Sequence, residues 1–304
     1  MAAPELATGP VTVTVPATSA NLGPGFDCLG LALDLRDELT AEVGGAGLVV
    51  EVRGEGASEL PRDASHLVAR SMEAAFGAMD VTTPSLALSC LNRIPHARGL
   101  GSSSAAIVGG IALARALVVD GERRLDDAAA FALANAIEGH PDNVAPALFG
   151  GFVVCGQSED DVWADPAPLD PRVCAVVFIA PDRLDTEVAR RLLPAEISYA
   201  DAAANTARAA LLVTALGGAP ERLLRATEDF LHQSARRPAM PDSLALVDRL
   251  RADGHAAVVS GAGPTVLVLT TDHDTESLAA YAPAGWTRRA LAVSWLGVVV
   301  QSGR

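Results

Sequence analysis

Apolar residues along the chain recur with two periods, one typical of strands and one typical of helices. Valine and threonine alternate over residues 11–15, which predicts a strand that ends at Pro16. Short apolar runs bounded by glycine and other turn residues predict the remaining strands. They lie at residues 39–43, 48–53, 85–94, 151–155, 173–180, 256–260, 265–269 and 292–300.

Apolar residues spaced three and four apart predict the helices. These helices cover residues 64–79, 105–119, 126–138, 185–193, 200–216, 221–231 and 244–252. Ser102, Ser103 and Ser104 mark the start of the second helix, because serine favours N-cap positions. The acidic stretch 158–170 is interpreted as a solvated loop.

Strands and helices are mixed along the chain without strict βαβ alternation. This order favours an α+β fold over a doubly wound parallel sheet. The length of 304 residues suits one large domain or two intimately joined ones. We divide the chain into an N-terminal domain, residues 1–155, and a C-terminal domain, residues 156–304.

The charge balance argues against nucleic acid as a partner. The formal net charge is −14, from 23 basic and 37 acidic residues, whereas binding to a phosphate backbone depends on clustered basic side chains. The sequence contains no lysine, which excludes a P-loop lysine, a kinase strand lysine and Schiff-base chemistry. Any positive charge that a functional site needs must therefore come from arginine, helix N-termini or metal ions.

A cytoplasmic location away from membranes is expected. Residues 1–10 lack the basic and apolar regions of a secretory signal. The most apolar segment, residues 105–119, is too short to span a bilayer and carries Arg115.

The four cysteines are interpreted as small buried apolar residues. They show neither C-x-x-C spacing nor a paired histidine, so a zinc site is not expected. These cysteines are Cys28, Cys90, Cys155 and Cys174.

The strongest local signal for chemistry is a glycine- and serine-rich run that leads directly into an apolar helix. Its glycines let the backbone approach an anion closely, and the helix N-terminus offers unpaired N–H groups with positive dipole. Taken alone, the run fits a phosphate site and plain helix capping about equally well. It reads Pro95-His96-Ala97-Arg98-Gly99-Leu100-Gly101-Ser102-Ser103-Ser104-Ala105.

Three further blocks carry glycine or clustered polar residues. Residues 16–27 place Asn21 and Asp27 after the first strand, although asparagine and aspartate also serve as ordinary turn formers. Residues 260–265 form either a simple hairpin turn or a glycine loop that crowds against a nucleotide. Residues 138–143 bring a carboxylate, an imidazole and an amide close together, which suits binding of Mg²⁺ and a polar substrate. The end of a helix would account for Gly139 and Pro141 in this block, but not for its three polar side chains.

The three glycine-rich blocks are residues 16–27, 95–105 and 260–265. In this order and at these separations, they resemble the signatures of the GHMP kinases. Residues 16–27, residues 138–143, and Leu231-His232-Gln233 followed by Arg236 narrow the resemblance to the homoserine kinase group. The resemblance covers residues 11 to about 269, nearly the whole chain. It implies the two-domain GHMP kinase fold, with an N-terminal domain like domain 2 of ribosomal protein S5 and a C-terminal ferredoxin-like α/β sandwich.

The resemblance implies that ATP and Mg²⁺ are used to phosphorylate the side-chain hydroxyl of L-homoserine. The product would be O-phospho-L-homoserine, for threonine biosynthesis. By position, residues 95–105 match the phosphate loop of the family, with Arg98 as a flanking cation or simply an exposed side chain. The implied substrate-binding residues are Asn21, Asp27, His140, Thr186, Arg190 and Arg236. A homodimer is common among relatives, but nothing in the sequence identifies an interface.

The resemblance also implies catalytic and metal-binding residues. His140, Asp142 and Asn143 match the polar cluster beside the substrate. Glu138 is the candidate metal ligand because it is the only carboxylate between Asp127 and His140, with Ser103 as a second ligand. The register of this glutamate stays open, and so does the identity of any catalytic base.

Two other functions compete with this one. The first is a GHMP kinase that acts on another small alcohol, such as mevalonate or a methylerythritol derivative. Two arginines together with Asp27 favour a zwitterionic amino acid over a simple carboxylate. The second is a protein of the same fold that binds ATP and a metabolite as a sensor, without turnover. The polar residues at 138–143 argue against a sensor.

Overall fold

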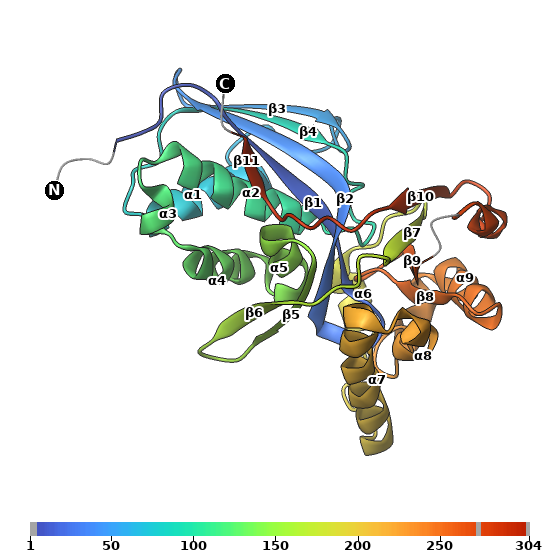
Figure 1. Ribbon diagram of the computed structural model, residues 1–304. Helices are drawn as coiled ribbons and strands as arrows, with labels where there is room; N and C mark the ends of the chain where they lie inside the picture. The colour runs from blue at the N-terminus through green and yellow to red at the C-terminus, as the bar shows by residue number, and fades with distance from the viewer. Residues whose placement is uncertain (1–4, 272–274, 302–304) are drawn as a thin grey trace.

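A large antiparallel-rich sheet forms one half of the molecule. The computed structural model describes residues 5–271 and 275–301. The strands of this first sheet follow the order β11-β1-β2-β4-β3, with β5 paired to the outer part of β2 and β6 paired to β5 (Figure 1). Their bounds are β1 (Val11–Asn21), β2 (Gly25–Val43), β3 (Leu48–Gly54), β4 (Leu86–Asn92), β5 (Phe152–Gln157), β6 (Val162–Ala167) and β11 (Val299–Gln301).

Helices between these strands cover one face of the first sheet. Helices α2 (Ser102–Leu117) and α5 (Pro141–Phe149) pack on β1 and β2, while α1 (Leu67–Ala78) and α4 (Asp127–Glu138) pack on α2. The short α3 (Gly121–Arg124) follows α2. Buried apolar side chains fill the space between α2 and the sheet, among them Val15, Leu39 and Ile111. This packing places the first turn of α2 beside the end of β1.

A second sheet forms the other half, with the order β10-β7-β9-β8. Its strands are β7 (Cys174–Ile179), β8 (Ala256–Val259), β9 (Val266–Thr270) and β10 (Thr287–Leu291). The helical elements of this half are α6 (Thr186–Arg191), α7 (Tyr199–Gly218), η1 (Pro220–Arg222), α8 (Leu223–Ala226), η2 (Ser234–Ala239), α9 (Pro241–Ala252) and η3 (Thr275–Tyr281). Alternate residues of β9 enter two different hydrophobic clusters, so this strand is buried on both faces.

The chain crosses between the two halves more than once. After β10 it returns to the first sheet, where Val293 bridges to Leu33 and β11 pairs with β1 (Figure 1). Residue 155 lies inside β5, and strands β6 and β11 of the first sheet follow it. The division into domains at residue 155 stays a prediction.

Several expected elements differ from the observed ones. The strand expected at residues 39–43 is the end of the much longer β2, because Gly25–Val43 pairs continuously along β1 through two register shifts. The helix expected at residues 221–231 stops at Ala226, and Asp229 accepts three backbone N–H groups in the turn that follows. The strand expected at residues 292–300 is a single bridge followed by the short β11.

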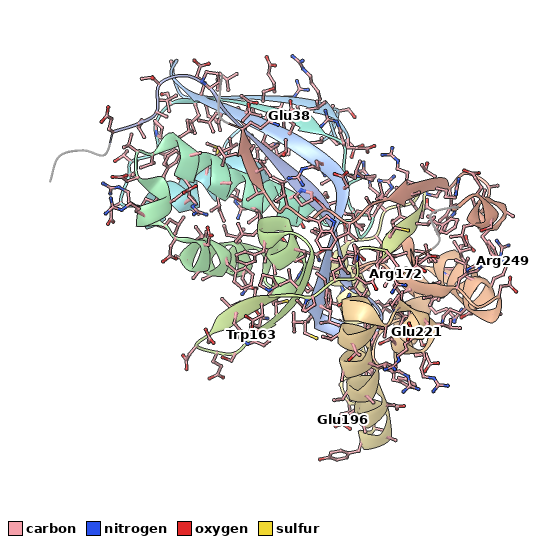
Figure 2. The ribbon with its side chains drawn as sticks, in the orientation of Figure 1. Glu38, Trp163, Arg172, Glu196, Glu221 and Arg249 are labelled. Atoms are coloured by element: carbon pink, nitrogen blue, oxygen red, sulfur yellow. The ribbon has the colours of Figure 1, made fainter. Side chains whose placement is uncertain are left out.

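The stretch 158–170 is not a solvated loop throughout. Residues 162–167 form the edge strand β6, which pairs with β5 and completes the hairpin that projects from the first sheet (Figure 2). Its Trp163 is 45% exposed and lies against Gly156. Polar and proline residues hide this strand in the sequence, because strand positions at a sheet edge need little apolar character.

Candidate active site

One cavity of about 430 Å³ receives residues from all four sequence blocks. It lies where the end of β1, the start of α2 and the start of α5 face the loop between β8 and β9. Most of the candidate site residues line it: Asn21, Asp27, His96, Ala97, Arg98, Gly99, Leu100, Gly101, Ser102, Ser103, Glu138, His140, Asp142, Asn143, Thr186, Arg190 and Arg236. Three residues of the predicted phosphate loop, Pro95, Ser104 and Ala105, are buried and do not line the cavity.

The run at residues 95–105 forms a tight loop that ends on the N-terminus of α2. Gly99 and Gly101 have φ of 74° and 70°, in the left-handed region that glycine adopts without a steric penalty. A side chain on Gly99 would meet the Ser260 carbonyl oxygen at 2.2 Å, so the β8–β9 loop crowds directly against this run. Gly101 is the N-cap of α2 and has no side chain to cap the first turn. The geometry therefore fits an anion at the helix N-terminus.

Arg98 lines this part of the cavity, but its guanidinium is used within the protein. The side chain donates to the carbonyl oxygens of Ala180, His96 and Pro181 at 3.0, 2.9 and 2.7 Å. Arg98 is half-buried rather than exposed. It ties the loop to the end of β7, and its role as a cation for phosphate stays a prediction.

Glu138 lies beside the first turn of α2. Its Oε1 accepts hydrogen bonds from Ser103 Oγ at 2.5 Å and from Ser104 Oγ at 2.8 Å. A carboxylate and a hydroxyl are oxygen ligands of the kind that Mg²⁺ prefers, and Mg²⁺ usually completes its sphere with phosphates and water. The described residues hold no cluster of three or more His, Cys, Asp or Glu side chains suited to a metal. The residues present thus fit a metal shared with a nucleotide rather than a cage made by the protein alone.

The opposite end of the cavity holds two arginines and one aspartate. Arg190 binds Asp27 through two hydrogen bonds, at 2.9 and 2.7 Å, and the hydrogen bond to Asp27 raises the pKa of Arg190. Arg236 is only 1% exposed, and its Nε has no hydrogen-bond partner. Burial, followed by the charge of Arg190, lowers the pKa of Arg236 to about 10. Arg236 thus brings a largely desolvated positive charge to the cavity wall, where an anionic ligand group would pair with it.

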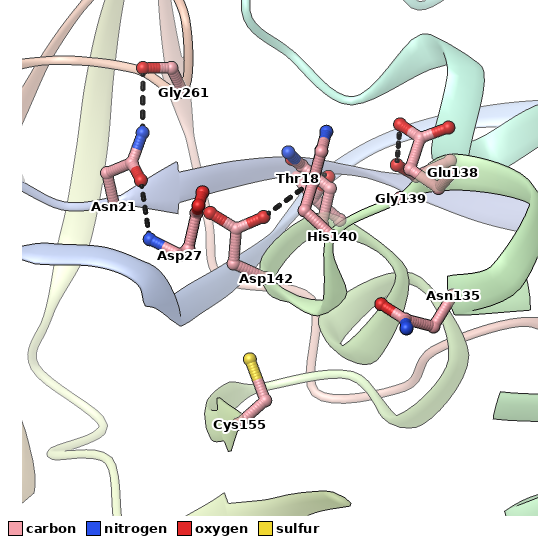
Figure 3. Close-up of polar contacts among 12 residues, drawn as sticks. Thr18, Asn21, Asp27, Asn135, Glu138, Gly139, His140, Asp142, Cys155 and Gly261 are labelled. Carbon is pink, nitrogen blue, oxygen red and sulfur yellow. Dashed lines mark hydrogen bonds and ion pairs between the residues drawn. The ribbon is translucent and has the colours of Figure 1, made fainter. Parts of the chain in front are cut away.

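Phe26 and His232 hold this charged end in place. The guanidinium carbons of Arg190 and Arg236 lie 5.5 and 5.6 Å from the centre of the Phe26 ring. Arg236 Nη1 lies 3.0 Å from His232 Nδ1 and donates to the Gly261 carbonyl oxygen at 3.1 Å. Asn21 bridges the same region: its amide nitrogen donates to Gly261 O, and its amide oxygen accepts from Asp27 N–H (Figure 3).

The half-buried His140 and the buried Asp142 form a pair at the start of α5. His140 Nδ1 lies 2.9 Å from Asp142 Oδ1, and Asp142 is 2% exposed (Figure 3). Burial lowers the pKa of His140, but the hydrogen bond and negative charge of Asp142 outweigh it and raise the net pKa above the ordinary value. Thr186, at the start of α6, is exposed at the cavity mouth one helical turn before Arg190.

Comparison with known proteins identifies the family. The model of the GHMP kinase N-terminal domain matches residues 64–151, and the model of the GHMP kinase C-terminal domain matches residues 209–286. A homoserine kinase of Streptomyces avermitilis is 50% identical over 303 residues, which cover 99% of this chain and 98% of the relative. The chain belongs to the homoserine kinases of the GHMP kinase family. The family, the enzyme class and the α+β GHMP kinase fold predicted from the sequence are thereby confirmed.

Other relatives of this GHMP kinase agree. A homoserine kinase of Clavibacter michiganensis is 48% identical over 303 residues, covering 97% of this chain and 96% of the relative. The crystal structure of homoserine kinase from Cytophaga hutchinsonii superposes with a TM-score of 0.81 at 24% identity, covering 96% of this chain and 97% of that one. This structure supports the fold. Within the described residues, no helix combines the length and the apolar character needed to cross a bilayer.

Part of the cavity wall was not expected from the sequence. Leu60, His66 and Val68 enclose the side near the phosphate loop, together with Asn92. Asp37 lies beneath them and accepts the backbone N–H groups of Arg93 and Ile94. These residues belong to no glycine-rich block, so their place in the site follows from the tertiary fold. Thr18, inside the block at residues 16–27, is also absent from the prediction; it does not line the cavity but donates to Asn143, which does.

Proposed function

We propose that this GHMP kinase transfers the γ-phosphoryl group of ATP to the side-chain hydroxyl of L-homoserine, giving O-phospho-L-homoserine. The observation that carries the proposal is the charged end of the cavity, which Asp27, Arg190 and the buried Arg236 line together. An α-amino acid carries one ammonium and one carboxylate, which match one acid and two guanidinium groups. The phosphate loop lines the same cavity, so donor and acceptor can lie side by side.

Binding of a zwitterion would exchange one ion pair for two. Asp27 and Arg190 form an ion pair with each other. A substrate ammonium would take Asp27, and its carboxylate would bind Arg190 and Arg236. A ligand with a carboxylate and no ammonium would break the same pair and leave Asp27 without a partner. The exchange thus favours homoserine over mevalonate, because an unpaired, partly buried charge is costly.

The other residues would align the two reacting groups. The glycine loop and the N-terminus of α2 would hold the nucleotide phosphates. Glu138 and Ser103 would hold Mg²⁺, which supplies positive charge to the phosphate oxygens. Asn143 lines the same cavity at the start of α5, as do His140 and Asp142. Phosphoryl transfer needs alignment and charge stabilisation more than a strong base, so we assign His140 and Asp142 to holding the acceptor.

The test is release of ADP from ATP and Mg²⁺ in the presence of homoserine, mevalonate, galactose or serine. We expect release with homoserine and little with the others. Release with mevalonate instead would favour the alternative kinase, and release with none would favour the sensor. In a second arm, Arg236→Met should raise the KM for homoserine at least tenfold and leave the KM for ATP within threefold. Arg237→Met is the matched control, because the Arg237 side chain is 44% exposed and pairs with Asp248.

A cytoplasmic location and a homodimer also stay predictions for this protein. Fractionation of the native cell and the solution mass of the purified chain would test them.

A further inference from the structure

Thr18 lies at the contact between the phosphate loop and the acceptor side of the cavity. It belongs to β1 and is fully buried, with an exposed fraction of 0%. Its backbone N–H donates to the Leu100 carbonyl oxygen at 3.0 Å, inside the phosphate loop. Its hydroxyl Oγ1 donates to Oδ1 of Asn143 at 2.8 Å, at the start of α5. One residue therefore touches both the element that holds the donor and the side chain that faces the acceptor.

The hydrogen bond from Thr18 fixes how the Asn143 amide is turned. Because Oδ1 receives the Thr18 hydroxyl, the amide nitrogen Nδ2 points away from Thr18, and Asn143 lines the cavity. A primary amide rotates freely about its last torsion, so without this bond either the oxygen or the nitrogen could face the cavity. Only the nitrogen can donate a hydrogen bond to a phosphoryl or hydroxyl oxygen.

Gly101 packs tightly against this pair. A side-chain carbon on Gly101 would lie 1.9 Å from Thr18 Oγ1 and 3.2 Å from Asn143 Oδ1. The Thr18 hydroxyl is therefore enclosed by the backbone of the phosphate loop on one side and by Asn143 on the other. Such enclosure leaves little freedom to the hydroxyl and the amide, which is what a positioning contact requires.

We propose that Thr18 is a positioning residue for phosphoryl transfer: it holds the Asn143 amide with Nδ2 toward the reacting oxygens and keeps it in register with the phosphate loop. This inference rests on the proposed kinase function and adds a residue to it. Thr18 itself touches neither ATP nor the acceptor. Its effect is exerted through Asn143, and an error of about 1 Å in such an alignment can cost about 100-fold in rate.

The test compares Thr18→Val, which removes the hydroxyl at constant shape, with Thr18→Ser, which keeps it. Thr18→Val should lower kcat 10- to 100-fold while the KM values for ATP and homoserine stay within about threefold. Thr18→Ser should keep at least a third of the wild-type kcat. Thr12→Val is the matched control, because Thr12 is on the same strand and its hydroxyl bonds to Thr40 instead. This control should turn over like the wild type.

A double mutant separates positioning from a merely structural role. In an Asn143→Ala background, Thr18→Val should cause no further loss of kcat, because the amide that Thr18 holds is gone. Multiplicative losses in the double mutant, or a kcat within twofold of wild type in folded Thr18→Val, would overturn the inference.

An NMR measurement that does not depend on enzymatic activity separates this inference from the proposed function. The side-chain NH₂ resonances of Asn143 should shift and broaden in Thr18→Val and stay in place in Thr18→Ser. Unchanged resonances in Thr18→Val would reject the role of Thr18 even in an active kinase. Absence of ADP release by the wild-type protein would instead reject the proposed function, and the resonances would still decide whether Thr18 holds the amide.

Discussion

At the scale of single residues, charged groups in the cavity satisfy one another before any ligand binds. Asp27 is paired with Arg190, and His140 is paired with Asp142. Arg236 differs, since its Nε is buried without a hydrogen-bond partner. An ionised group that is paired keeps its charge at low cost, whereas a buried and incompletely paired one favours any ligand that completes it. Arg236 lines the cavity, so its charge marks where a substrate anion would gain most.

The titration of His140 tests this view of paired charges. Asp142→Asn should lower the pKa of His140, because burial, which opposes the charged ring, then loses its main counterweight. An NMR pH titration of the ring, assigned with a His140→Gln variant, measures the change. Asp127→Asn serves as the control, since Asp127 is exposed and pairs with Arg115 instead. An unchanged pKa in Asp142→Asn would contradict the pairing.

The same pair affects stability with a definite sign. Because the folded pKa of His140 is raised, its charged form stabilises the fold fully below the unfolded value of about 6.5. That contribution is lost as the pH rises through the folded pKa. Urea unfolding at several pH values should show this loss in the wild type and lack it in Asp142→Asn.

At the scale of elements, the backbone of the predicted phosphate loop leaves no room for side chains at Gly99 and Gly101. Gly99 faces the β8–β9 loop, and Gly101 faces Thr18. Both residues have positive φ. The loop can therefore bring its N–H groups close to an anion while it packs against two other elements.

Gly101→Ala should impair this loop strongly. The added carbon would collide with Thr18 Oγ1 at 1.9 Å, and the positive φ adds about 1–2 kcal/mol of strain. We expect kcat to fall at least tenfold and the KM for ATP to rise, as measured by ADP release. Gly254→Ala is the control for strain alone, because Gly254 has φ of 90° with open space around it. Activity of Gly101→Ala equal to that of Gly254→Ala would refute the importance of this packing.

The sequence predicted the elements whose local chemistry is distinctive. Glycines and serines before an apolar run indicate the loop and the start of α2, and the apolar runs of β7 and β9 indicate strands equally clearly. Strand β6 was missed because an exposed edge tolerates polar residues and proline. The pairing of Asp27 with Arg190 joins residues 163 positions apart, so no local pattern could place them together. Thr18 was missed for the same reason, since its partner is 125 positions away.

At the scale of the whole molecule, Arg36 fastens the returning chain segment to the first sheet. Its guanidinium donates to Ser294 Oγ and to the carbonyl oxygens of Leu296 and Gly297. It also donates to both oxygens of Thr14 on β1. One side chain thus joins strand β1, strand β2 and the segment that follows β10.

Arg36→Met should destabilise the protein by about 2–3 kcal/mol, because several hydrogen bonds from a charged group are lost and part-buried carbonyls are left unpaired. Urea unfolding measures this change. Arg53→Met is the matched control, since Arg53 on β3 is exposed and forms an ion pair with the equally exposed Glu51. A free energy of unfolding equal to that of the control would show that the segment is held by other contacts.

The pairing of β1 with β11 has a consequence for how the protein is made. Strand β1 is synthesised first among the strands and β11 last, yet they are neighbours in the finished sheet. During translation, β1 can pair with β2 early, but its other edge waits until the second half has emerged from the ribosome. An unpaired strand edge is a site for mispairing with other chains. The part of this edge at Thr12–Thr14 therefore stays open to mispairing until β11 has been made.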